Sequence, residues 1–148
     1  MIKRVDNIED AKKCDELLTK LIHDEKQYDD SIDDNFVVNN FYPTIYNNDD
    51  RVIFGYYLDD LLIGYIYVYE NYSNNIKGYF IDALYVEEDY RHRGYGRELI
   101  NEALSYAEGN EGKFIDIKVL NQNSIAKELY KSSGFNEFKV MLRKDINV

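Results

Sequence analysis

The chain has 148 residues, and 45% of them are hydrophobic, which is enough to build one compact domain with its own core. One proline, eight glycines and no low-complexity linker predict a single domain over residues 1–148. With 28 acidic and 18 basic residues the net charge is −10, and a surface this negative repels phosphate backbones and anionic lipid, which argues against nucleic-acid and membrane partners.

The chain opens with a predicted short strand over residues 2–5. Apolar residues then recur at helical spacing from Ile8 to about Lys26 and predict an amphipathic helix. Asp6 and Glu9 have the spacing of a capping box at the start of this helix.

The only cysteine, Cys14, lies on the apolar stripe of this helix, so we expect a buried thiol and not a nucleophile. One cysteine allows no intrachain disulfide, which fits a reducing compartment. The first residues lack the apolar core of a secretory signal, and the longest apolar stretch, residues 61–69, is too short to span a membrane. We therefore expect a cytoplasmic protein.

The middle of the chain changes from helical to extended patterns. An acid-rich segment, residues 24–34, leads to a second, shorter predicted helix around residues 35–42, which Pro43 ends or bends. Two runs of β-branched and aromatic residues, 52–58 and 61–69, follow with Asp59-Asp60 between them and predict an antiparallel hairpin.

The last third alternates strands and helices. Residues 79–86 predict a third strand of the meander, and an apolar stripe predicts a helix that stops near Gly109. A strand over 114–119 and a helix from about Ser124 follow, and alternating Phe138, Val140 and Leu142 predict a final strand. The order β-α-α-β-β-β-α-β-α-β indicates a mixed α/β domain.

The most informative segment lies between the strand that ends at Val86 and the next helix. Its glycines let a phosphate approach the unpaired N–H groups at the helix start, where the helix dipole is positive. A dinucleotide fingerprint would need glycine at Leu99, and a P-loop would need Ser or Thr after Gly112-Lys113, so both motifs fail. The predicted anion site consists of Arg91, His92, Arg93, Gly94, Tyr95, Gly96 and Arg97.

This segment resembles motif A of the GCN5-related N-acetyltransferases (GNAT family), Arg/Gln-x-x-Gly-x-Gly/Ala, from Arg91 to Gly96. The preceding strand, residues 81–86, resembles the family's fourth strand. A second segment has the family spacing Asn-x-x-Ala-x-x-Leu-Tyr-x-x-x-Gly-Phe, carried by Asn123, Ala126, Leu129, Tyr130, Gly134 and Phe135. Two motifs in the family's order, over nearly the whole chain, make this resemblance specific.

The resemblance implies a sheet splayed between its fourth and fifth strands, with acetyl-CoA as the acyl donor. Pantetheine would pair with the backbone of Leu84, Tyr85 and Val86, and the pyrophosphate would lie on the turn over residues 91–97. A backbone N–H near Leu84 or Tyr85 would polarise the thioester carbonyl. Asn123 would lie beside the pantetheine arm, and as the residue before a helix it is equally suited to be an N-cap.

Acetyl transfer to an amine requires two proton movements. An alkylamine with a pKa of about 10.4 is protonated at neutral pH and must lose a proton before it attacks. Asp82 is our candidate base, with a water relay as the alternative. The family motif implies that Tyr130 hydrogen-bonds the departing thiolate, whereas a tyrosine packed in the core remains the other interpretation. We assign neither histidine to catalysis and expect no metal site.

The resemblance implies that the acceptor site is built from the first two helices, their connection and the neighbouring strands. Carboxylates between Asp24 and Asp34 and many tyrosines lie in this part of the chain, and both attract cations. We therefore expect a small cationic amine, such as a polyamine or an aminoglycoside, or else a peptide amine. A solvated acidic loop, a non-catalytic acetyl-CoA sensor, a donor with a longer acyl chain and a homodimer all remain open.

Overall fold

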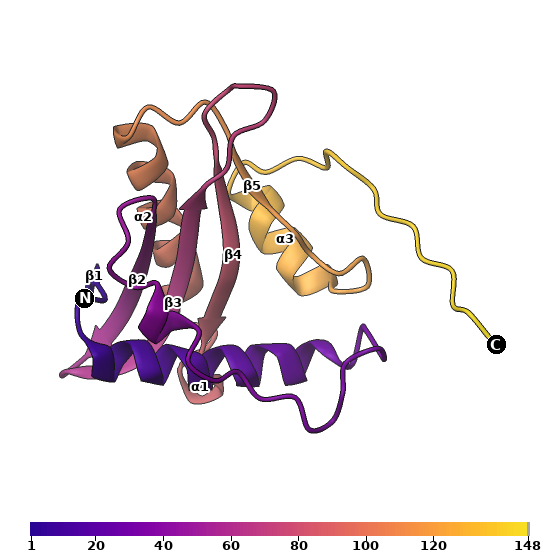
Figure 1. Ribbon diagram of the computed structural model, residues 1–148, viewed down its shortest axis with the longest axis horizontal. Helices are drawn as coiled ribbons and strands as arrows, with labels where there is room; N and C mark the ends of the chain where they lie inside the picture. Colours follow the sequence, from indigo (N-terminus) through magenta and orange to yellow (C-terminus); the bar gives the residue numbers. More distant parts are fainter. Residues whose placement is uncertain (148) are drawn as a thin grey trace.

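The computed structural model describes residues 1–147, and a five-stranded sheet forms its middle layer (Figure 1). The first four strands pair antiparallel, and the last pairs in parallel with its neighbour. The strands lie in sequence order: β1 (Ile2–Arg4), β2 (Arg51–Leu58), β3 (Leu61–Glu70), β4 (Tyr79–Val86) and β5 (Ile115–Ile117). The predicted antiparallel meander and the later helical crossover are confirmed.

Helices cover both faces of the sheet. Helix α1 (Ile8–Glu25) packs on one face, and α2 (Tyr95–Gly109) packs on the other (Figure 1). Helix α3 (Ser124–Ser132) follows β5. Two short 3₁₀ turns, η1 (Tyr42–Thr44) and η2 (Glu88–Tyr90), complete the order.

Helix α1 begins one residue away from the predicted capping box. Asn7 is the N-cap, and its side-chain oxygen accepts the Asp10 N–H at 2.9 Å. The apolar stripe buries Ala11, Cys14 and Leu17 at a spacing of three residues. Burial raises the pKa of the Cys14 thiol, with smaller contributions from nearby carboxylates, so this cysteine is a packing residue, as predicted.

The predicted second helix over residues 35–42 is wrong, because only the η1 turn forms there. Side chains of α1 occupy the backbone N–H groups that such a helix would need. The Asp15 carboxylate accepts the N–H of Phe41 at 3.2 Å and of Tyr42 at 2.9 Å, and the Thr19 hydroxyl accepts the N–H of Val38 at 3.0 Å. The segment is thereby extended along α1.

The predicted final strand is also wrong in this chain. Residues 136–147 follow α3 as an extended segment that runs away from the body of the molecule (Figure 1). Phe138, Val140 and Leu142 are 79%, 84% and 90% exposed. Alternation alone cannot form a strand, because a strand needs a partner edge for its backbone groups.

A β-bulge in β4 opens the sheet. Val68 of β3 pairs with Ile81 and Tyr67 pairs with Ala83, so Asp82 is the extra residue between them. The bulge reverses the alternation of β4, since Ile81 packs on the α2 side and Ala83 on the α1 side. Pairing of β4 with β5 ends at Ile81. The predicted splay between the fourth and fifth strands is therefore confirmed.

Candidate active site

Beyond the bulge, β4 presents an edge from which β5 has diverged. The Glu87 N–H donates to the Ile63 carbonyl of β3 at 2.8 Å. Since consecutive strand residues direct their backbone groups to opposite edges, the backbone groups of Val86 and Leu84 face the diverged side. Those of Tyr85 face β3. Of the two residues that the sequence proposed for the polarising N–H, Leu84 is the one whose N–H faces the diverged side.

The turn after β4 leads directly into the N-terminus of α2. Gly94 is the N-cap with a left-handed φ of 84°, a conformation that glycine adopts without strain. Having no side chain, Gly94 caps none of the first N–H groups of α2, which remain directed outward with the positive end of the helix dipole. Tyr95 and Gly96 begin the helix; the Tyr95 ring packs 4.4 Å from the Tyr56 ring.

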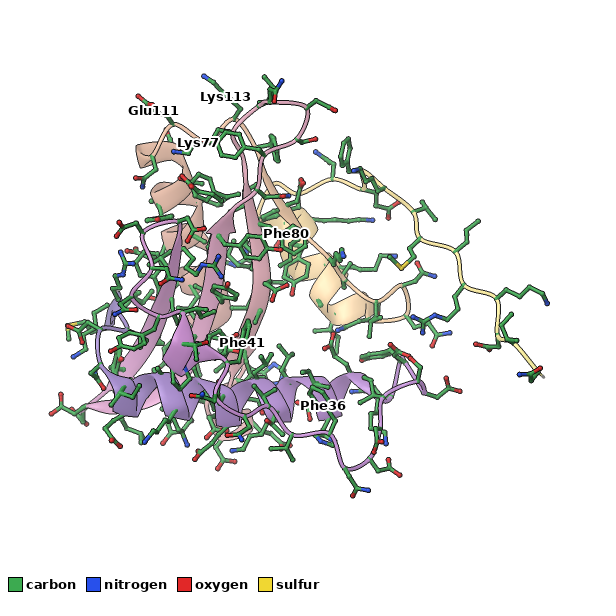
Figure 2. All side chains as sticks on the ribbon, viewed as in Figure 1. Phe36, Phe41, Lys77, Phe80, Glu111 and Lys113 are labelled. Atoms are coloured by element: carbon green, nitrogen blue, oxygen red, sulfur yellow. The ribbon has the colours of Figure 1, made fainter. Side chains whose placement is uncertain are left out.

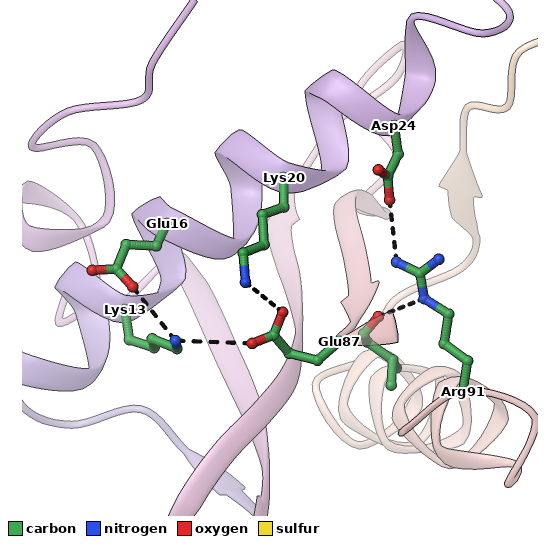
Figure 3. A network of polar contacts seen from close by, with 7 residues as sticks. Lys13, Glu16, Lys20, Asp24, Glu87 and Arg91 are labelled. Atoms are coloured by element: carbon green, nitrogen blue, oxygen red, sulfur yellow. Dashed lines mark hydrogen bonds and ion pairs between the residues drawn. The ribbon is translucent and has the colours of Figure 1, made fainter. Parts of the chain in front are cut away.

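Arg91 is held within the protein and is not directed into solvent (Figure 3). Its Nε donates to the Val86 carbonyl at 2.8 Å, and its Nη2 lies 3.1 Å from the Asp24 carboxylate of α1. The guanidinium also lies over the Tyr85 ring, 5.1 Å from its centre. Arg91 therefore joins the end of β4 to α1 and shapes the turn, with its Nε and Nη2 groups both bonded within the protein.

Beside Arg91, a group of ion pairs holds α1 against the end of β4 (Figure 3). Glu87 accepts a hydrogen bond from Lys20 at 2.7 Å and lies 3.9 Å from Lys13. The hydrogen bond that Lys20 donates to Glu87 raises the pKa of Lys20. These contacts position the first helix relative to the β4 edge.

The remaining polar residues of the turn have different surroundings. His92 is exposed and left-handed, with a φ of 64°. Arg93 is exposed; it donates to the Asp89 carbonyl at 3.3 Å and lies 5.7 Å from the centre of the Tyr90 ring. Arg97 donates to the Ser132 hydroxyl of α3 at 2.9 Å. Of the three arginines, Arg93 has the weakest attachment and the freest approach to an anion at this turn.

Helix α3 contributes the two residues that the second motif singled out. Asn123 is its N-cap and accepts the Ala126 N–H at 3.1 Å. Tyr130 is half-buried near Phe135, with ring centres 6.2 Å apart. Burial, assisted by the charge of Glu25, raises the pKa of Tyr130 to about 12. Its phenol is therefore protonated across the physiological range.

Asp82 lies at the bulge and remains accessible to solvent. Partial burial of its carboxyl raises its pKa, and the charge of Lys118 opposes the shift. Burial raises the pKa of Tyr67 and of Tyr69, and the charge of Asp82 adds a smaller contribution to both. By strand pairing, Asp82 lies at the point where β4 and β5 part, next to Ala83 of the α1-side core.

Glu25, at the end of α1, is a half-buried carboxylate to which the sequence assigned no role. Burial raises its pKa, followed by the charges of Asp29 and Asp24. Its charge also adds to the raised pKa of Tyr130 on α3, after the larger effect of burial. The only sequence signal for Glu25 was its position in the acid-rich segment. The sequence alone does not distinguish it from the neighbouring carboxylates, because only the folded structure shows which of them is buried.

Aromatic rings gather on the α1 side of the sheet, among them Phe41 and Phe80 (Figure 2). The Tyr42 and Tyr65 hydroxyls lie 2.9 Å apart, and the Tyr69 ring stacks on Phe80 at 5.5 Å. The predicted grouping of tyrosines on this side is present in the folded chain. We call this surface the aromatic wall: Phe41, Tyr42, Tyr65, Tyr67, Tyr69 and Phe80.

Two classes of feature are missing from the part of the chain that the structure describes. Residues 1–147 contain no group of three His, Cys, Asp or Glu side chains arranged to hold a metal ion. Among the described helices, none combines the length and apolar character needed to cross a membrane.

Several solved structures share this fold. A tetramutant of the BH1408 protein from Bacillus halodurans superposes with a TM-score of 0.84 at 19% identity, covering 99% of both chains. An aminoglycoside acetyltransferase, meta-AAC0020, from an uncultured soil metagenomic sample has a TM-score of 0.75 at 16% identity, over 100% of this chain and 95% of that chain. Ribosomal-protein-alanine N-acetyltransferase from Brucella melitensis biovar Abortus 2308 has a TM-score of 0.71 at 16% identity, over 98% of both.

No curated protein matches the sequence significantly. The sequence model of the acetyltransferase (GNAT) family, by contrast, matches residues 15–135. That span includes the bulged β4, the turn at the start of α2, and α3 up to Phe135. The resemblance inferred from the two motifs is confirmed, and the chain belongs to the acetyltransferase (GNAT) family.

Proposed function

We propose that this protein is an acetyl-CoA-dependent N-acetyltransferase acting on a primary amine of a small cationic molecule, of polyamine or aminoglycoside type. One observation carries the proposal: the backbone edge of β4 that β5 leaves unpaired lies next to the N-terminus of α2, whose first N–H groups have no side-chain cap. Peptide amines are the second acceptor class. Two proteins of similar fold are named for these classes, one for aminoglycosides and one for a ribosomal-protein alanine.

The residues at this junction fit an extended donor with a diphosphate. The backbone groups of Leu84 and the Val86 N–H offer strand-like hydrogen bonds, while the Val86 carbonyl is already used by Arg91. The N–H groups of Tyr95, Gly96 and Arg97 offer an anion site, and Arg93 adds a positive side chain. Bound there, acetyl-CoA supplies an activated acetyl thioester, and the Leu84 N–H polarises its carbonyl.

Asp82 is the proposed acceptor of the amine proton. Its raised pKa makes it a better base than an ordinary aspartate, and it remains accessible at the bulge. The adjacent aromatic wall attracts a cationic amine through cation–π contacts. Glu25, whose pKa is also raised by burial, is the second candidate, and a water relay can link either carboxylate to the amine.

Tyr130 is proposed to stabilise the departing thiolate by donating a hydrogen bond. A thiol has a pKa of about 8.5, and that of Tyr130 is about 12. Full proton transfer from the phenol would therefore be uphill by about 5 kcal/mol. A hydrogen bond that strengthens as negative charge develops on sulfur avoids this cost.

The test is acetyl-CoA-dependent release of free thiol across polyamines, aminoglycosides, amino acids and basic peptides. Tyr130→Phe should lower kcat about tenfold or more with little change in acetyl-CoA affinity, because it removes a contact that acts at the departing sulfur. Tyr72→Phe, an exposed tyrosine on the β3–β4 connection, is the matched control. Unchanged turnover in Tyr130→Phe would remove the assignment.

A sensor that binds acetyl-CoA without turnover is the alternative. It needs the β4 edge and the α2 N-terminus but has no use for Tyr130 or for a base with a raised pKa. Acetyl-CoA binding with no thiol release for any amine would favour the sensor. Failure to bind acetyl-CoA would exclude both functions.

A further inference from the structure

Lys118 is the first residue after β5, at the point where β5 leaves β4. The parallel pairing of the two strands ends with Ile81 beside Ile117. Asp82 and Lys118 are therefore the next residues along the two strands, and both side chains are exposed. The sequence analysis gave Lys118 no role, and the mechanism proposed above does not use it.

The Lys118 ammonium lies over an aromatic ring. Its Nζ is 5.7 Å from the centre of the Phe80 ring, within the range in which the face of a ring attracts a cation. Phe80 stacks on Tyr69, and Tyr69 packs against the α1-side core. Lys118 therefore places a primary ammonium of the chain itself on the aromatic wall.

Carboxylates lie beside this ammonium. Asp82 is next to Lys118 in the strand register, and the charge of Lys118 opposes the rise in the pKa of Asp82 that burial causes. Asp116 lies beside Phe80 in the register. Because the residues on either side of Asp116 pack on the α2 side, alternation along β5 directs Asp116 to the α1 side. An aromatic face flanked by carboxylates is the environment that suits the ammonium of an acceptor.

Arg51, another cation beside the aromatic wall, is bonded in place. Its Nη1 donates to the Tyr67 hydroxyl at 3.0 Å, and its Nε donates to the Asp50 carboxylate at 3.0 Å. Lys118, by contrast, is an exposed side chain beyond the end of its strand. Its ammonium can leave the Phe80 ring without breaking an ion pair of this kind.

We propose that Lys118 is a specificity-determining residue of the acceptor site: its ammonium holds the cation position over Phe80, and a cationic acceptor binds there by displacing it. The inference rests on the proposed function, which assigns the acceptor to Asp82 and the aromatic wall. Displacement ends the contact between Lys118 and the ring and brings two positive charges close together. Lys118 therefore weakens the binding of a cationic acceptor.

The experiment is calorimetric titration of the full chain with spermidine, a polyamine. Lys118→Met keeps a long apolar side chain and removes the charge, and we expect it to bind spermidine about two- to fivefold more tightly than the unaltered chain. Lys113→Met is the matched control, because Lys113 is an exposed lysine at the opposite end of β5. It removes the same charge and should leave the affinity unchanged. Lys118→Arg keeps the charge and should bind no more tightly than the unaltered chain.

Three results would overturn the inference. Weaker binding in Lys118→Met would mean that Lys118 assists the ligand and does not compete with it. An equal gain in Lys113→Met or in Lys118→Arg would assign the effect to net charge or to side-chain shape. Equal affinity in Lys118→Met and the unaltered chain, or no binding to either, would mean that the position over Phe80 is not a cation site.

Thiol release from acetyl-CoA, measured on the same variants, separates this inference from the proposed function. With spermidine as acceptor, KM should fall in Lys118→Met by the same factor as the dissociation constant, while kcat changes little. Tighter spermidine binding in Lys118→Met without thiol release for any amine would contradict acetyl transfer and still support the role of Lys118 in cation binding. Thiol release with a KM that Lys118→Met does not lower would contradict the role of Lys118 alone.

Discussion

Arg91 and Arg93 lie two positions apart in one turn and have different tasks. Arg91 donates inward to the Val86 carbonyl and Asp24, while Arg93 is exposed and has a single backbone contact at 3.3 Å. Both belong to the anion site predicted from the sequence. Their contacts indicate that Arg91 builds the turn and that Arg93 is available to the ligand.

This division predicts opposite effects of two alanine substitutions. Arg91→Ala should lower the free energy of unfolding by roughly 1.5–3 kcal/mol, because it removes a charge-assisted hydrogen bond to a backbone carbonyl. Arg93→Ala should change the free energy of unfolding by less than about 0.5 kcal/mol. It should, however, weaken coenzyme A binding and make that binding less dependent on salt concentration. Urea unfolding and calorimetric titration with coenzyme A separate the two. Normal stability with weak binding in Arg91→Ala would assign phosphate contact to Arg91 instead.

Glu25 makes stability depend on pH. Burial raises its pKa above the ordinary 4.5, so its favourable contribution is complete below pH 4.5 and is lost as pH rises through the raised value. Glu25→Gln should therefore have a higher Tm than the unaltered protein at pH 7 and the same Tm near pH 4. Glu128→Gln, at an exposed position of α3, should show no such difference. A Glu25→Gln gain that persisted at low pH would point to a cause other than ionisation.

At the scale of elements, the bulge in β4 makes the candidate site possible. It separates the part of β4 that pairs with β5 from the part whose backbone edge is left unpaired where β5 diverges. On the other edge of β4, Gly64 of β3 allows the backbones of β3 and β4 to approach each other closely. A Cβ at Gly64 would lie 2.7 Å from the Tyr85 carbonyl oxygen and 3.2 Å from the Val86 Cα.

Gly64→Ala should accordingly displace β4 at the site. We expect a loss of roughly 1–3 kcal/mol in unfolding free energy together with weaker coenzyme A binding, since backbone atoms cannot rotate away as a side chain can. Gly109→Ala is the control, because a Cβ there meets no described atom within 4 Å. Urea denaturation of both variants checks this. Equal stability of the two would mean that β3 and β4 adjust without strain.

At the scale of the whole molecule, two helical layers enclose the sheet, and the surface carries a charge of −10. The local positive charge of the α2 N-terminus and Arg93 lies within this negative field. The proposed anionic donor and cationic acceptor would therefore approach different surfaces of the protein.

The acceptor affinity should then weaken with salt. For a polyamine or aminoglycoside at saturating acetyl-CoA, we expect KM to rise several-fold between low salt and about 0.5 M salt, because the Debye length shortens to a few ångströms. The kcat value should change little. A KM that does not depend on salt would argue for an acceptor recognised by shape or apolar contact.

The sequence alone predicted the elements whose signals are local. Helices α1, α2 and α3 and strands β2 to β4 follow from periodicity, caps and turn residues, and Asn123 was correctly identified as suited to an N-cap. The two motifs, with their spacing, identified the family. Each of these features depends on residues close together in the chain, so a short window contains its cause.

Features that depend on distant partners were settled by tertiary structure. The Asp15 carboxylate holds residues 41–42 and prevents the expected helix, and Phe138 to Leu142 form no strand without a neighbouring edge. Arg91 is turned inward by Val86 and Asp24, and Glu25 differs from other acidic residues only through its burial near Tyr130. Local sequence specified which residues could form elements and bind an anion. Long-range packing decided which polar side chains form hydrogen bonds within the protein and which are left accessible to a ligand. Hydrogen bonding and burial depend on residues that are distant in the sequence and become neighbours only when the chain folds.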